Sequence, residues 1–550
     1  MTSFRRLPTA GHVDLSKPVT FSFDGKSYRG FAGDTLASAL LANDVTLVGR
    51  SFKYHRPRGF ISAGVEETNG LFTLGTDART EPNIPGTMVD LVDGLTAKSQ
   101  NAWPSVAFDV MAVNQLAAPL FQSGFYYKTF MGPTKGSWMF FEPFIRKAAG
   151  LGQATRDFDP DRYETRYDFC DVLVIGSGAS GLAAAIAAGR SGARVMLVEQ
   201  DSQLGGGLLS EPSLTGWRAD RLAELKRLAN VKTLTHTTAQ GLYDDNQVVL
   251  VERRDHLKPA PEKGQSRQVL TMLRTKAIVF ATGAIERPLV FSNNDRPGVM
   301  LASALRSYLN RFGVVPDQRA VIATNNDTAY ATAFDLAAAG VMVFVADHRK
   351  TVAADLLAEA ARLKVVVYAD TGVADVAGRG RLHQVTLAGA HAATISCDAL
   401  GVSGGWSPAV HITSHNGIKP VYDERIAAFV PGGFAKTHFG AGAVMGTFGL
   451  KAAIAEGSAT GGKAAAVAGF TGETASLPIP SVADRAYTIL PVWTPPVPGK
   501  GKSFVDFQND VTAKDIKIAH QEGYQSVEHL KRYTTLGMGT DQGKTSNINA

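Results

Sequence analysis

The chain has 550 residues, enough for roughly two to four domains, and with 45% hydrophobic and 19% charged residues it has the composition of a globular protein. A formal net charge of +6 is small for this length and argues against nucleic-acid binding. Its two cysteines, Cys170 and Cys397, leave no room for a disulfide framework or a cysteine-held metal site. Without a signal-peptide core or an uninterrupted apolar run of membrane length, we expect a cytoplasmic protein with no membrane partner.

Residues 1–100 are predicted to form a small β-grasp domain. Residues 19–29 alternate apolar and polar side chains around an Asp-Gly turn, which predicts a hairpin. A helix is expected over residues 35–42, with Asp34 as its N-cap. For the basic, aromatic segment 51–59 we expect surface salt bridges, with contact to a partner or a cofactor phosphate as the alternative.

Residues 101–167 are irregular, rich in aromatic side chains and punctuated by glycine and proline. We expect them to form a connecting arm packed on the larger domain that follows.

The most informative motif is a glycine fingerprint between the two apolar strands of residues 171–199. The order of strand, glycine turn, helix, strand and acid is that of a dinucleotide-binding unit. Gly176 permits the tight turn, Gly178 lets the backbone approach a pyrophosphate, and Gly181 lets the helix pack close to the strand. The helix N-terminus offers N–H groups to phosphate, and Glu199 is placed to bond ribose hydroxyls. We therefore predict a nucleotide site here.

The domain with this motif is expected over residues 168–480. A second glycine-rich turn contains Gly206 and Gly207, and a buried strand ends in Ala-Thr-Gly at Gly283. A second strand–helix–strand pattern follows within an insertion at about residues 315–400, but Asn325, Asn326 and Asp327 occupy its glycine turn. The fold class is thus α/β, with two Rossmann-like dinucleotide-binding units of the FAD/NAD(P) type, the second degenerate and with a weak or absent site.

The nucleotide is a choice between FAD and NAD. The order of units resembles that of flavin-dependent disulfide reductases and amine dehydrogenases, which favours FAD. Those proteins carry an acid in the segment that returns to the first unit, where it binds the ribityl chain, but here Ala443 stands at that position. NAD has no ribityl chain, so we favour NAD, and Glu199 favours NAD over NADP because a carboxylate repels a 2′-phosphate.

Residues 481–550 begin with a Pro-rich stretch, which we interpret as a linker. Two helical segments follow, at residues 511–523 and 526–533. Because the sequence stops without a terminal pattern, we expect a fragment of a longer polypeptide.

Four segments, 51–59, 324–330, 504–516 and 531–545, resemble the alpha subunit of heterotetrameric sarcosine oxidase. The resemblance implies a complex of alpha, beta, gamma and delta subunits that oxidises sarcosine to glycine at an FAD on the beta subunit. It also implies that electrons pass through an FMN at the alpha–beta boundary to oxygen, which gives hydrogen peroxide, and that tetrahydrofolate takes up the one-carbon unit as methylenetetrahydrofolate. By the same resemblance the alpha subunit holds NAD and continues into a folate-binding, aminomethyltransferase-like domain, and this chain alone is not a competent enzyme.

The resemblance also implies site residues. Carried onto this sequence, the NAD contacts are Ser180, Glu199, Gln200, Asp201, Gly207, Ala239, Ala443, Phe448 and Leu450. Lys544 and Thr545, on a glycine-rich turn, are candidates for holding the FMN phosphate, with a solvated loop as the alternative.

Both ends of the chain resemble iron–sulfur modules that have lost their ligands. Residues 1–100 contain no cysteine, and in the C-terminal module the cluster positions carry Asp506, Gln508, Asp541 and Ser546. Since such a cluster needs four thiolates, we expect none at either end.

The remaining candidate residues give weaker evidence for a functional site. His411 and His415 have a spacing that can place two ligands on one helical face, but no third ligand is evident and we expect no metal. Cys170 is expected to pack, Glu286 and Arg287 to support loops, and no residue stands out as catalytic. Two alternatives remain open: an FAD-dependent amine, opine or hydroxyproline dehydrogenase subunit, and a scaffold with vestigial nucleotide sites.

Overall fold

The computed structural model describes residues 2–9, 11–134, 136–254, 264–472, 477–481, 485–494, 497 and 499–550. The chain forms two compact units, each assembled from separated stretches. Unit 1 comprises Met1–Asp159, Glu286–Gly405 and Leu490–Ala550, and unit 2 comprises Pro160–Ile285 and Trp406–Ile489. The second Rossmann-like segment therefore groups with the two ends of the chain, and not with the glycine fingerprint.

Unit 2 contains a seven-stranded sheet in the order β11-β10-β9-β14-β13-β12, with β28 paired to β14. The strands β11, β10, β9, β14 and β28 are parallel, whereas β12 and β13 form an antiparallel extension of β14. The bounds are β9 (Tyr163–Ile175), β10 (Val195–Val198), β11 (Val231–Leu234), β12 (Thr237–Tyr243), β13 (Gln247–Arg253), β14 (Gln268–Phe280) and β28 (His438–Gly440).

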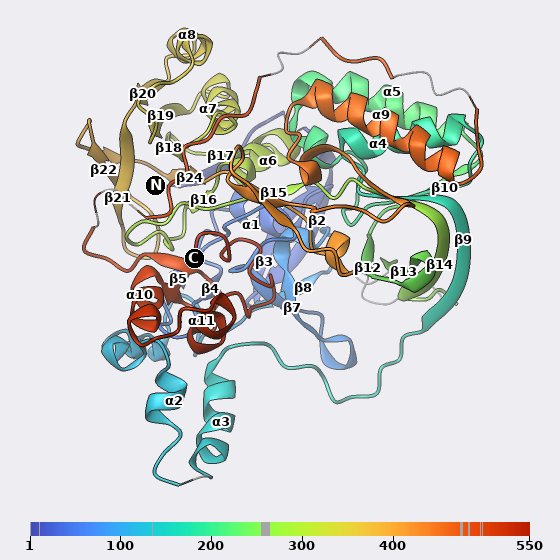
Figure 1. The fold of residues 1–550 in the computed structure, drawn as a ribbon. Helices are drawn as coiled ribbons and strands as arrows, with labels where there is room; N and C mark the ends of the chain where they lie inside the picture. Colours follow the sequence, from blue (N-terminus) through green and yellow to red (C-terminus); the bar gives the residue numbers. More distant parts are fainter. Residues whose placement is uncertain are drawn as a thin grey trace. The chain divides into compact units, whose positions relative to one another are not determined.

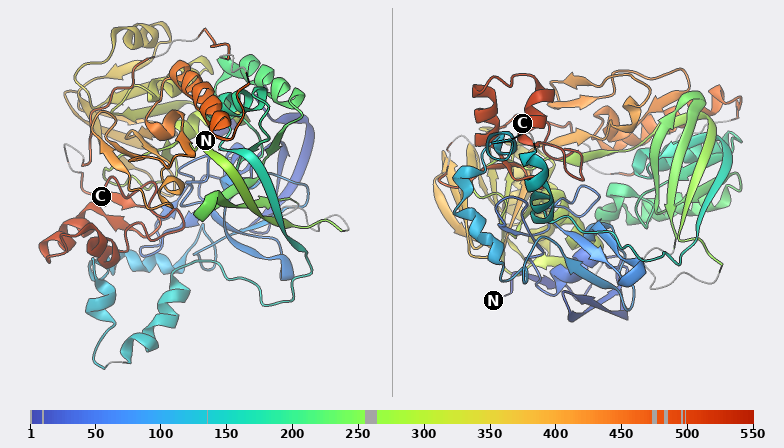
Figure 2. Two further views of the ribbon diagram at one scale, coloured as in Figure 1. Left: turned by 45° about the vertical axis from the view of Figure 1, so that its right-hand side comes forward. Right: turned by 90° about the horizontal axis from the view of Figure 1, so that it is seen from below.

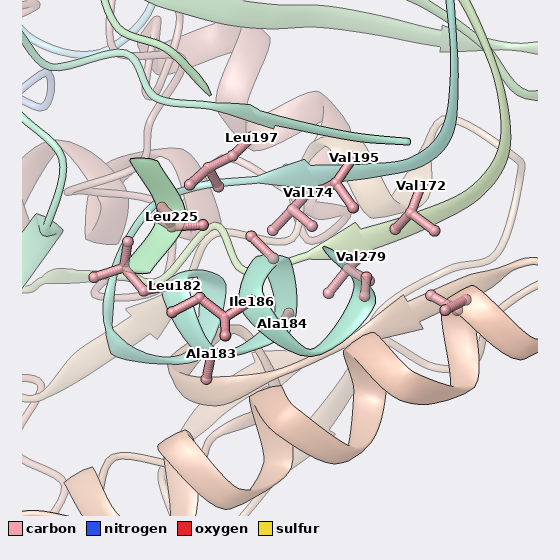
Figure 3. Close-up of a cluster of buried hydrophobic side chains, with 14 of the residues drawn as sticks. Val172, Val174, Leu182, Ala183, Ala184, Ile186, Val195, Leu197, Leu225 and Val279 are labelled. Carbon is pink, nitrogen blue, oxygen red and sulfur yellow. The ribbon is translucent and has the colours of Figure 1, made fainter. Parts of the chain in front are cut away.

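Three helices cover one face of this sheet: α4 (Ala179–Arg190), α5 (Thr215–Arg227) and α9 (Leu450–Val467) (Figure 1). Successive side chains of a strand point to opposite faces. Val172 and Val174 of β9 accordingly face Leu182 and Ile186 of α4 (Figure 3), while Leu173 packs with the residues of the antiparallel extension. The fingerprint helix is thus held between the sheet and α9.

Short elements complete unit 2. They are η5 (Gly206–Ser210), η6 (Pro212–Leu214), η7 (Asp244–Asn246), β15 (Ala284–Glu286), β25 (Trp406–Pro408), η8 (Ile412–Ser414), β26 (Val421–Asp423), β27 (Ala428–Val430) and η9 (Gly442–Met445), with β15 ending one residue inside unit 1.

Unit 1 begins with the predicted β-grasp domain, a five-stranded sheet in the order β3-β2-β8-β6-β7. The hairpin turn at Asp24 and Gly25 is confirmed, but the helix starts one residue late. Thr35, and not Asp34, is its N-cap, in a capping box with Ser38, whereas Asp34 accepts hydrogen bonds from the side chains of Arg6 and Ser38. The bounds are β1 (Phe4–Arg6), β2 (Asp14–Phe23), β3 (Lys26–Ala32), α1 (Leu36–Ala42), β4 (Gly49–Arg50), β5 (Pro57–Arg58), β6 (Leu71–Leu74), η1 (Asp77–Arg79), β7 (Glu81–Pro85), η2 (Gly86–Met88) and β8 (Thr96–Ser99).

A parallel five-stranded sheet, β16-β24-β18-β19-β20, forms the second layer of unit 1. It begins near residue 299, earlier than the expected 315, and β21, β22 and β23 add an antiparallel sheet. The bounds are β16 (Val299–Leu301), α6 (Ala302–Phe312), β17 (Val314–Pro316), β18 (Arg319–Thr324), α7 (Ala329–Ala338), β19 (Met342–Asp347), α8 (Ala354–Arg362), β20 (Val366–Tyr368), β21 (Thr371–Ala377), β22 (Gln384–Gly389), β23 (Ala393–Ser396) and β24 (Ala399–Ser403).

The arm is less packed than expected. It carries η3 (Val110–Gln115), η4 (Ala118–Leu120), α2 (Phe125–Thr129) and α3 (Ser137–Ala148), and the left view of Figure 2 shows α2 and α3 in cyan, extending from the rest of unit 1. Many of its large apolar side chains are exposed, among them Leu116 (84%), Met139 (71%) and Phe158 (90%). The expectation that the arm packs along the larger domain is therefore wrong for these residues.

The C-terminal module comprises β29 (Phe504–Asp506), β30 (Val511–Thr512), α10 (Ala513–Gln521) and α11 (Val527–Thr534). The basic segment 51–59 is anchored to it and is not a surface strip. Arg58, 1% exposed, forms ion pairs with Asp295 and Asp510, and Arg56 binds Asp295 through two hydrogen bonds of 2.6 and 2.7 Å. The expectation of exposed salt bridges fails because carboxylates from distant segments converge on these guanidinium groups.

Among the described residues, no helix combines the length and the apolarity needed to cross a bilayer.

Candidate dinucleotide site

The three glycines of the fingerprint have different structural roles. Gly176 has φ +97°, and a Cβ there would lie 2.3 Å from the carbonyl oxygen of Ala281. A Cβ on Gly181 would lie 1.9 Å from the carbonyl oxygen of Gly176, so helix and turn meet without space for a side chain. A Cβ on Gly178 would meet nothing within 4 Å. Gly178 therefore borders open space at the N-terminus of α4, where a pyrophosphate would approach the helix N–H groups.

Glu199 is held at the edge of this turn by defined partners. One carboxylate oxygen accepts hydrogen bonds from the N–H (2.9 Å) and the hydroxyl (2.7 Å) of Ser177, and the other accepts the N–H of Asp201 (3.0 Å). The Ser177 hydroxyl in turn accepts the N–H of Gly205, at 2.9 Å. These hydrogen bonds join the fingerprint to the second glycine-rich turn. Gln200, which lies between Glu199 and Asp201 in the chain, is exposed.

The second glycine turn lies beside the first. A Cβ on Gly206 would come within 3.2 Å of the Cα of Gly178, and Gly207 borders open space. Both residues are exposed. A ligand at Gly178 would therefore also meet this turn.

The return segment lies on the start of α4. The hydroxyl of Ser180 donates to the carbonyl of Ala441 at 3.3 Å, and a Cβ on Gly442 would lie 2.4 Å from that hydroxyl. The N–H of Gly442 donates to Glu456 of α9, at 2.8 Å. Ala443 follows, half-buried, so no carboxylate stands at that position.

The remaining predicted residues are more dispersed. Leu450 begins α9, the ring of Phe448 lies 4.6 Å from that of Tyr487, and Ala239 lies at a bulge of β12. Gly283, with φ +75°, borders open space. Lys544 and Thr545 belong to unit 1, whereas α4 belongs to unit 2.

The second Rossmann-like unit is filled by its own side chains. Asn325 and Asn326 are fully buried, and Asn326 bonds Ser403 and Thr328. Arg349 forms ion pairs with Asp327 (2.5 Å) and Asp347 (2.7 Å), so the acid at the end of β19 is neutralised within the protein.

The Pro-rich segment, expected to be a linker, packs against the same loop. The N–H of Leu490 donates to the carbonyl of Asn325 (2.9 Å), and the guanidinium of Arg287 lies 5.3 Å from the centre of the Trp493 ring. Arg287 also donates to the carbonyl of Gly404, while Glu286 accepts the N–H of Ser303, as expected of loop supports.

In the C-terminal module, three of the four residues that the sequence comparison placed at cluster positions serve as acceptors. Asp506 accepts the N–H groups of Asn509 and Gly537, both within 2.9 Å, and Gln508 accepts that of Thr540 at 2.7 Å. Asp541 closes the next turn by accepting the N–H groups of Gly543 (3.0 Å) and Thr545 (3.3 Å).

The hydroxyl of Ser546, at the fourth position, is buried without a hydrogen-bond partner among the described residues. Burial lowers the pKa of Lys544, whose Nζ donates to the carbonyl of Asp541 at 3.2 Å.

His411 and His415 flank the short helix η8, and Nδ1 of His415 accepts the N–H of Leu242 at 3.3 Å. No three His, Cys, Asp or Glu side chains within the described ranges gather as metal ligands would.

The sequence reasoning missed Ser177 and Glu456, which hold Glu199 and Gly442 in place. A serine directly after the first glycine was a visible signal for Ser177, whereas Glu456 is brought to the return segment only by the folded position of α9.

Three family models match the chain: a 2Fe-2S iron-sulfur cluster binding domain at residues 16–102, a pyridine nucleotide-disulphide oxidoreductase at 170–432, and a sarcosine oxidase A3 domain at 500–550. The alpha subunit of a sarcosine oxidase from Rhizobium meliloti is 46% identical over 100% of this chain and 56% of its own length. One opine oxidase subunit from Agrobacterium tumefaciens is 34% identical, over 32% of this chain and 36% of its own. The chain thus spans little more than half the length of the sarcosine oxidase alpha subunit that it matches.

A solved structure, the L-proline dehydrogenase from P. horikoshii, covers 100% of this chain and 94% of its own at a TM-score of 0.64 and 19% identity. At that identity the likeness concerns the fold, and it confirms the predicted class: a Rossmann-like α/β core preceded by a ferredoxin-like domain.

Proposed function

The chain belongs to the family of sarcosine oxidase alpha subunits, and from that premise we propose that it is the NAD-binding part of such a protein, in a complex that oxidises sarcosine to glycine. We propose that beta, gamma and delta subunits complete the complex, that the beta subunit carries FAD, and that oxygen and tetrahydrofolate are its co-substrates. The two cysteines are free and buried thiols, which fits the reducing cytoplasm that we propose as its location.

The observation that carries the NAD assignment is the open space at Gly178. The turn brings Gly178, the adjacent Gly206 and the anchored carboxylate of Glu199 to the N-terminus of α4. These groups fit a dinucleotide: a pyrophosphate at the helix N–H groups and a ribose at the carboxylate. The methyl side chain of Ala443 offers no acceptor for a ribityl chain, which supports NAD over FAD.

The contacts within unit 2 assign tasks to further side chains. Ser177 keeps Glu199 oriented, and Ser180 and Glu456 hold the return segment on α4. When bound, NAD supplies a nicotinamide that can accept hydride. This chain's residues bind and orient it, and we assign no proton transfer to any of them.

The runner-up function is an opine or amine dehydrogenase subunit with its own FAD. The partial likeness to an opine oxidase favours it, and Ala443 argues against it.

Mass spectrometry of the small molecules released by heating the purified chain tests the assignment. We expect NAD and no FAD. Released FAD with a visible flavin band would favour the runner-up, and a nucleotide-free protein would favour the scaffold.

A matched pair of variants sharpens the test. Gly178→Ala places a methyl group in the open space without touching the protein, so the fold should remain while NAD retention falls at least tenfold. Gly216→Ala in α5, where a Cβ also meets nothing within 4 Å, should leave NAD retention unchanged. Equal retention in both variants would reject this location.

We also propose the exposed apolar side chains of the arm as the contact with another subunit. Leu116, Met139, Phe140 and Phe158 are each at least 66% exposed. Exposed apolar surface of this kind marks protein interfaces. Replacing Met139 and Phe140 together by Ser should weaken copurification of the beta subunit, and unchanged copurification would exclude these two residues from the interface.

For FMN we propose contact through Lys544 and Thr545 in the assembled complex. The Nζ of Lys544 donates to one carbonyl and has two further N–H bonds that could donate to a phosphate, which supports the FMN assignment. The carboxylate of Asp541 already accepts the N–H of Thr545, so a phosphate would have to displace it. Lys544→Met should lower the FMN content of the complex, and an unchanged content would reject the assignment.

A further inference from the structure

A cavity of about 400 Å³ lies in unit 1, where the neighbouring parallel strands β19 and β20 end. His348 directly follows β19, Asp370 follows β20 by two positions, and both line the cavity together with residues 491–494 of the Pro-rich segment. None of the lining residues belongs to the candidate dinucleotide site. In open α/β sheets, ligands bind outside the carboxyl ends of the strands, and small-molecule pockets have volumes of this order. The cavity thus has the place and the size of a ligand site.

A dinucleotide does not fit at this edge of the sheet, because the protein's own side chains fill its phosphate and ribose positions. Thr328, just before α7, donates its N–H (3.0 Å) and its hydroxyl (2.6 Å) to Asn326, so the N–H that would approach a phosphate is engaged. Asp347 at the end of β19, where a ribose would bind, is paired with Arg349 at 2.7 Å. The space that stays open lies beyond these groups, and it suits a ligand without phosphate.

The Pro-rich segment gives the cavity an aromatic wall that is held in place. The N–H of Leu490 fixes the start of this segment on the carbonyl of Asn325, at 2.9 Å. Trp493 lines the cavity, and the buried guanidinium of Arg287 lies 5.3 Å from the centre of its ring. The indole is half-buried, so part of its surface remains open to a ligand. Aromatic side chains pack well against other planar rings.

Asp370 supplies an accessible acceptor. Its backbone is fixed in the left-handed region, with φ +50°, because its N–H donates to the carbonyl of Arg349 (2.9 Å) and its carbonyl accepts the N–H of Ala390 (2.8 Å). The side chain is exposed, and its carboxylate has no hydrogen-bond or ion-pair partner within the described part of the chain. A carboxylate only accepts, and it binds two adjacent N–H donors best, one on each oxygen.

His348 borders the cavity without adding a positive charge. A Cβ on Gly372 would lie 2.2 Å from Cε1 of His348, so the ring rests on the backbone there. Burial lowers the pKa of His348, although Asp347 opposes the shift, and the imidazole is neutral at pH 7. No lysine or arginine is found among the lining residues that the structure describes, and Asp370 is their one acid. The cavity therefore favours a neutral or positively charged ligand over an anion.

From these contacts we propose that the cavity binds a planar heteroaromatic amine without phosphate, whose N–H groups donate to the carboxylate of Asp370 and whose ring packs against Trp493. An edge with two adjacent N–H groups, like that of a cyclic guanidine, matches the two oxygens of a carboxylate. The second Rossmann-like unit thus keeps a ligand site at its strand ends although its dinucleotide positions are filled.

Two probes of the same shape test the proposal: 2-aminobenzimidazole, which has the guanidine-like edge, and 2-methylbenzimidazole, in which a methyl group replaces the amino group. Titration calorimetry on the full chain, with excess NAD to fill the candidate dinucleotide site, should show the amino compound binding about tenfold more tightly, the effect of a hydrogen bond to a charged group. Crystals soaked in it should show its amino nitrogen within hydrogen-bond distance of Asp370. Equal affinities, no binding of either probe, or a probe found elsewhere would overturn the proposal.

Two variants and a control separate the hydrogen bonds from the ring contact. Asp370→Asn suits the left-handed backbone and replaces one acceptor oxygen by a donor, so it should abolish the preference between the probes. Asp245→Asn, at another exposed acid with φ +54°, should keep the tenfold preference. Trp493→Leu should weaken the binding of both probes several-fold and leave their ratio unchanged. A preference that survives in Asp370→Asn would contradict the role of its carboxylate, and unchanged binding in Trp493→Leu would remove this ring from the site.

Discussion

Glu199 accepts two hydrogen bonds from Ser177, one from its N–H at 2.9 Å and one from its hydroxyl at 2.7 Å. The acid at the end of the second strand thus supports the glycine turn at the same place where it would face a ribose. A ligand hydroxyl can bind the remaining lone pairs of this carboxylate without rearranging the turn.

The first prediction concerns this acid. Glu199→Gln removes the charge and one acceptor oxygen, and hydrogen bonds to charged groups contribute roughly 1.5–3 kcal/mol, so NAD affinity should fall about 10- to 100-fold. Titration calorimetry on protein stripped of nucleotide measures the effect. Glu359→Gln, an exposed acid paired with Arg362, is the control and should bind as the parent does. An affinity within twofold of the parent for Glu199→Gln would remove this acid from the site.

The second prediction concerns the contact between α9 and α4. A Cβ on Gly461 would lie 2.2 Å from the carbonyl oxygen of Ala184, so the helices meet backbone to backbone. Gly461→Ala should push them apart and lower the stability of unit 2 by roughly 1–3 kcal/mol, although alanine is the better helix former. Urea unfolding followed by circular dichroism measures this change. Gly216→Ala, in open space, should be neutral or stabilising. A Gly461→Ala protein as stable as the parent would show that α9 and α4 can move apart at this contact with little loss of stability.

The third prediction concerns pH. Burial, reinforced by the Glu66 carboxyl, raises the pKa of Glu286 to about 7. The folded protein therefore binds a proton here that the unfolded chain releases near pH 4.5, so the stability of unit 1 should fall as pH rises from about 4.5 to 7 and then level off. A shift of this size corresponds to about 3 kcal/mol.

Glu286→Gln, which stays neutral and keeps an acceptor for Ser303, should flatten that decline. Urea midpoints at pH 5 and pH 8 measure it. Burial also raises the pKa of Glu67 to about 7, so part of the slope should remain. An identical slope in parent and variant would show that Glu286 is ionised in the folded protein.

The fourth prediction concerns the buried ion pair of Arg58. Asp510→Asn leaves Arg58 without a carboxylate on that side, and removing one partner of a buried pair destabilises by roughly 3–5 kcal/mol. Because Asp510 also accepts the N–H groups of Lys53 and Tyr54, residues 500–550 should exchange amide hydrogens faster. Hydrogen exchange by mass spectrometry reports this change by segment.

The control for that experiment is Asp317→Asn. Asp317 pairs with the more exposed Arg5 at 3.5 Å, and such a pair contributes about 1 kcal/mol or less. Similar losses of stability in both variants would show that the burial of Arg58 does not determine how much the Asp510 substitution destabilises the protein.

The parts of the fold that could be predicted are those that depend on neighbouring residues. The turn at Gly176, the hairpin at Asp24 and the degenerate turn at Asn325 are each encoded within a few positions. The sequence predicted their structures because φ preferences and strand alternation act locally.

The features that escaped prediction depend on partners far apart in the chain. Arg58 is buried because Asp510, 452 positions away, meets it. His55 pairs with Asp109 across 54 positions, and no spacing rule relates the two. The sequence of a basic segment does not show which carboxylates pair with its arginines. Exposed neighbours and residues of a distant segment are equally compatible with it, so the burial of Arg58 could not be inferred.

The C-terminal module has a consequence for how a cell can make this protein. Its turns are closed by amide–oxygen contacts from Asp506, Gln508 and Asp541, all encoded in the polypeptide itself. Folding of the chain alone therefore brings the donors and acceptors of these turns together.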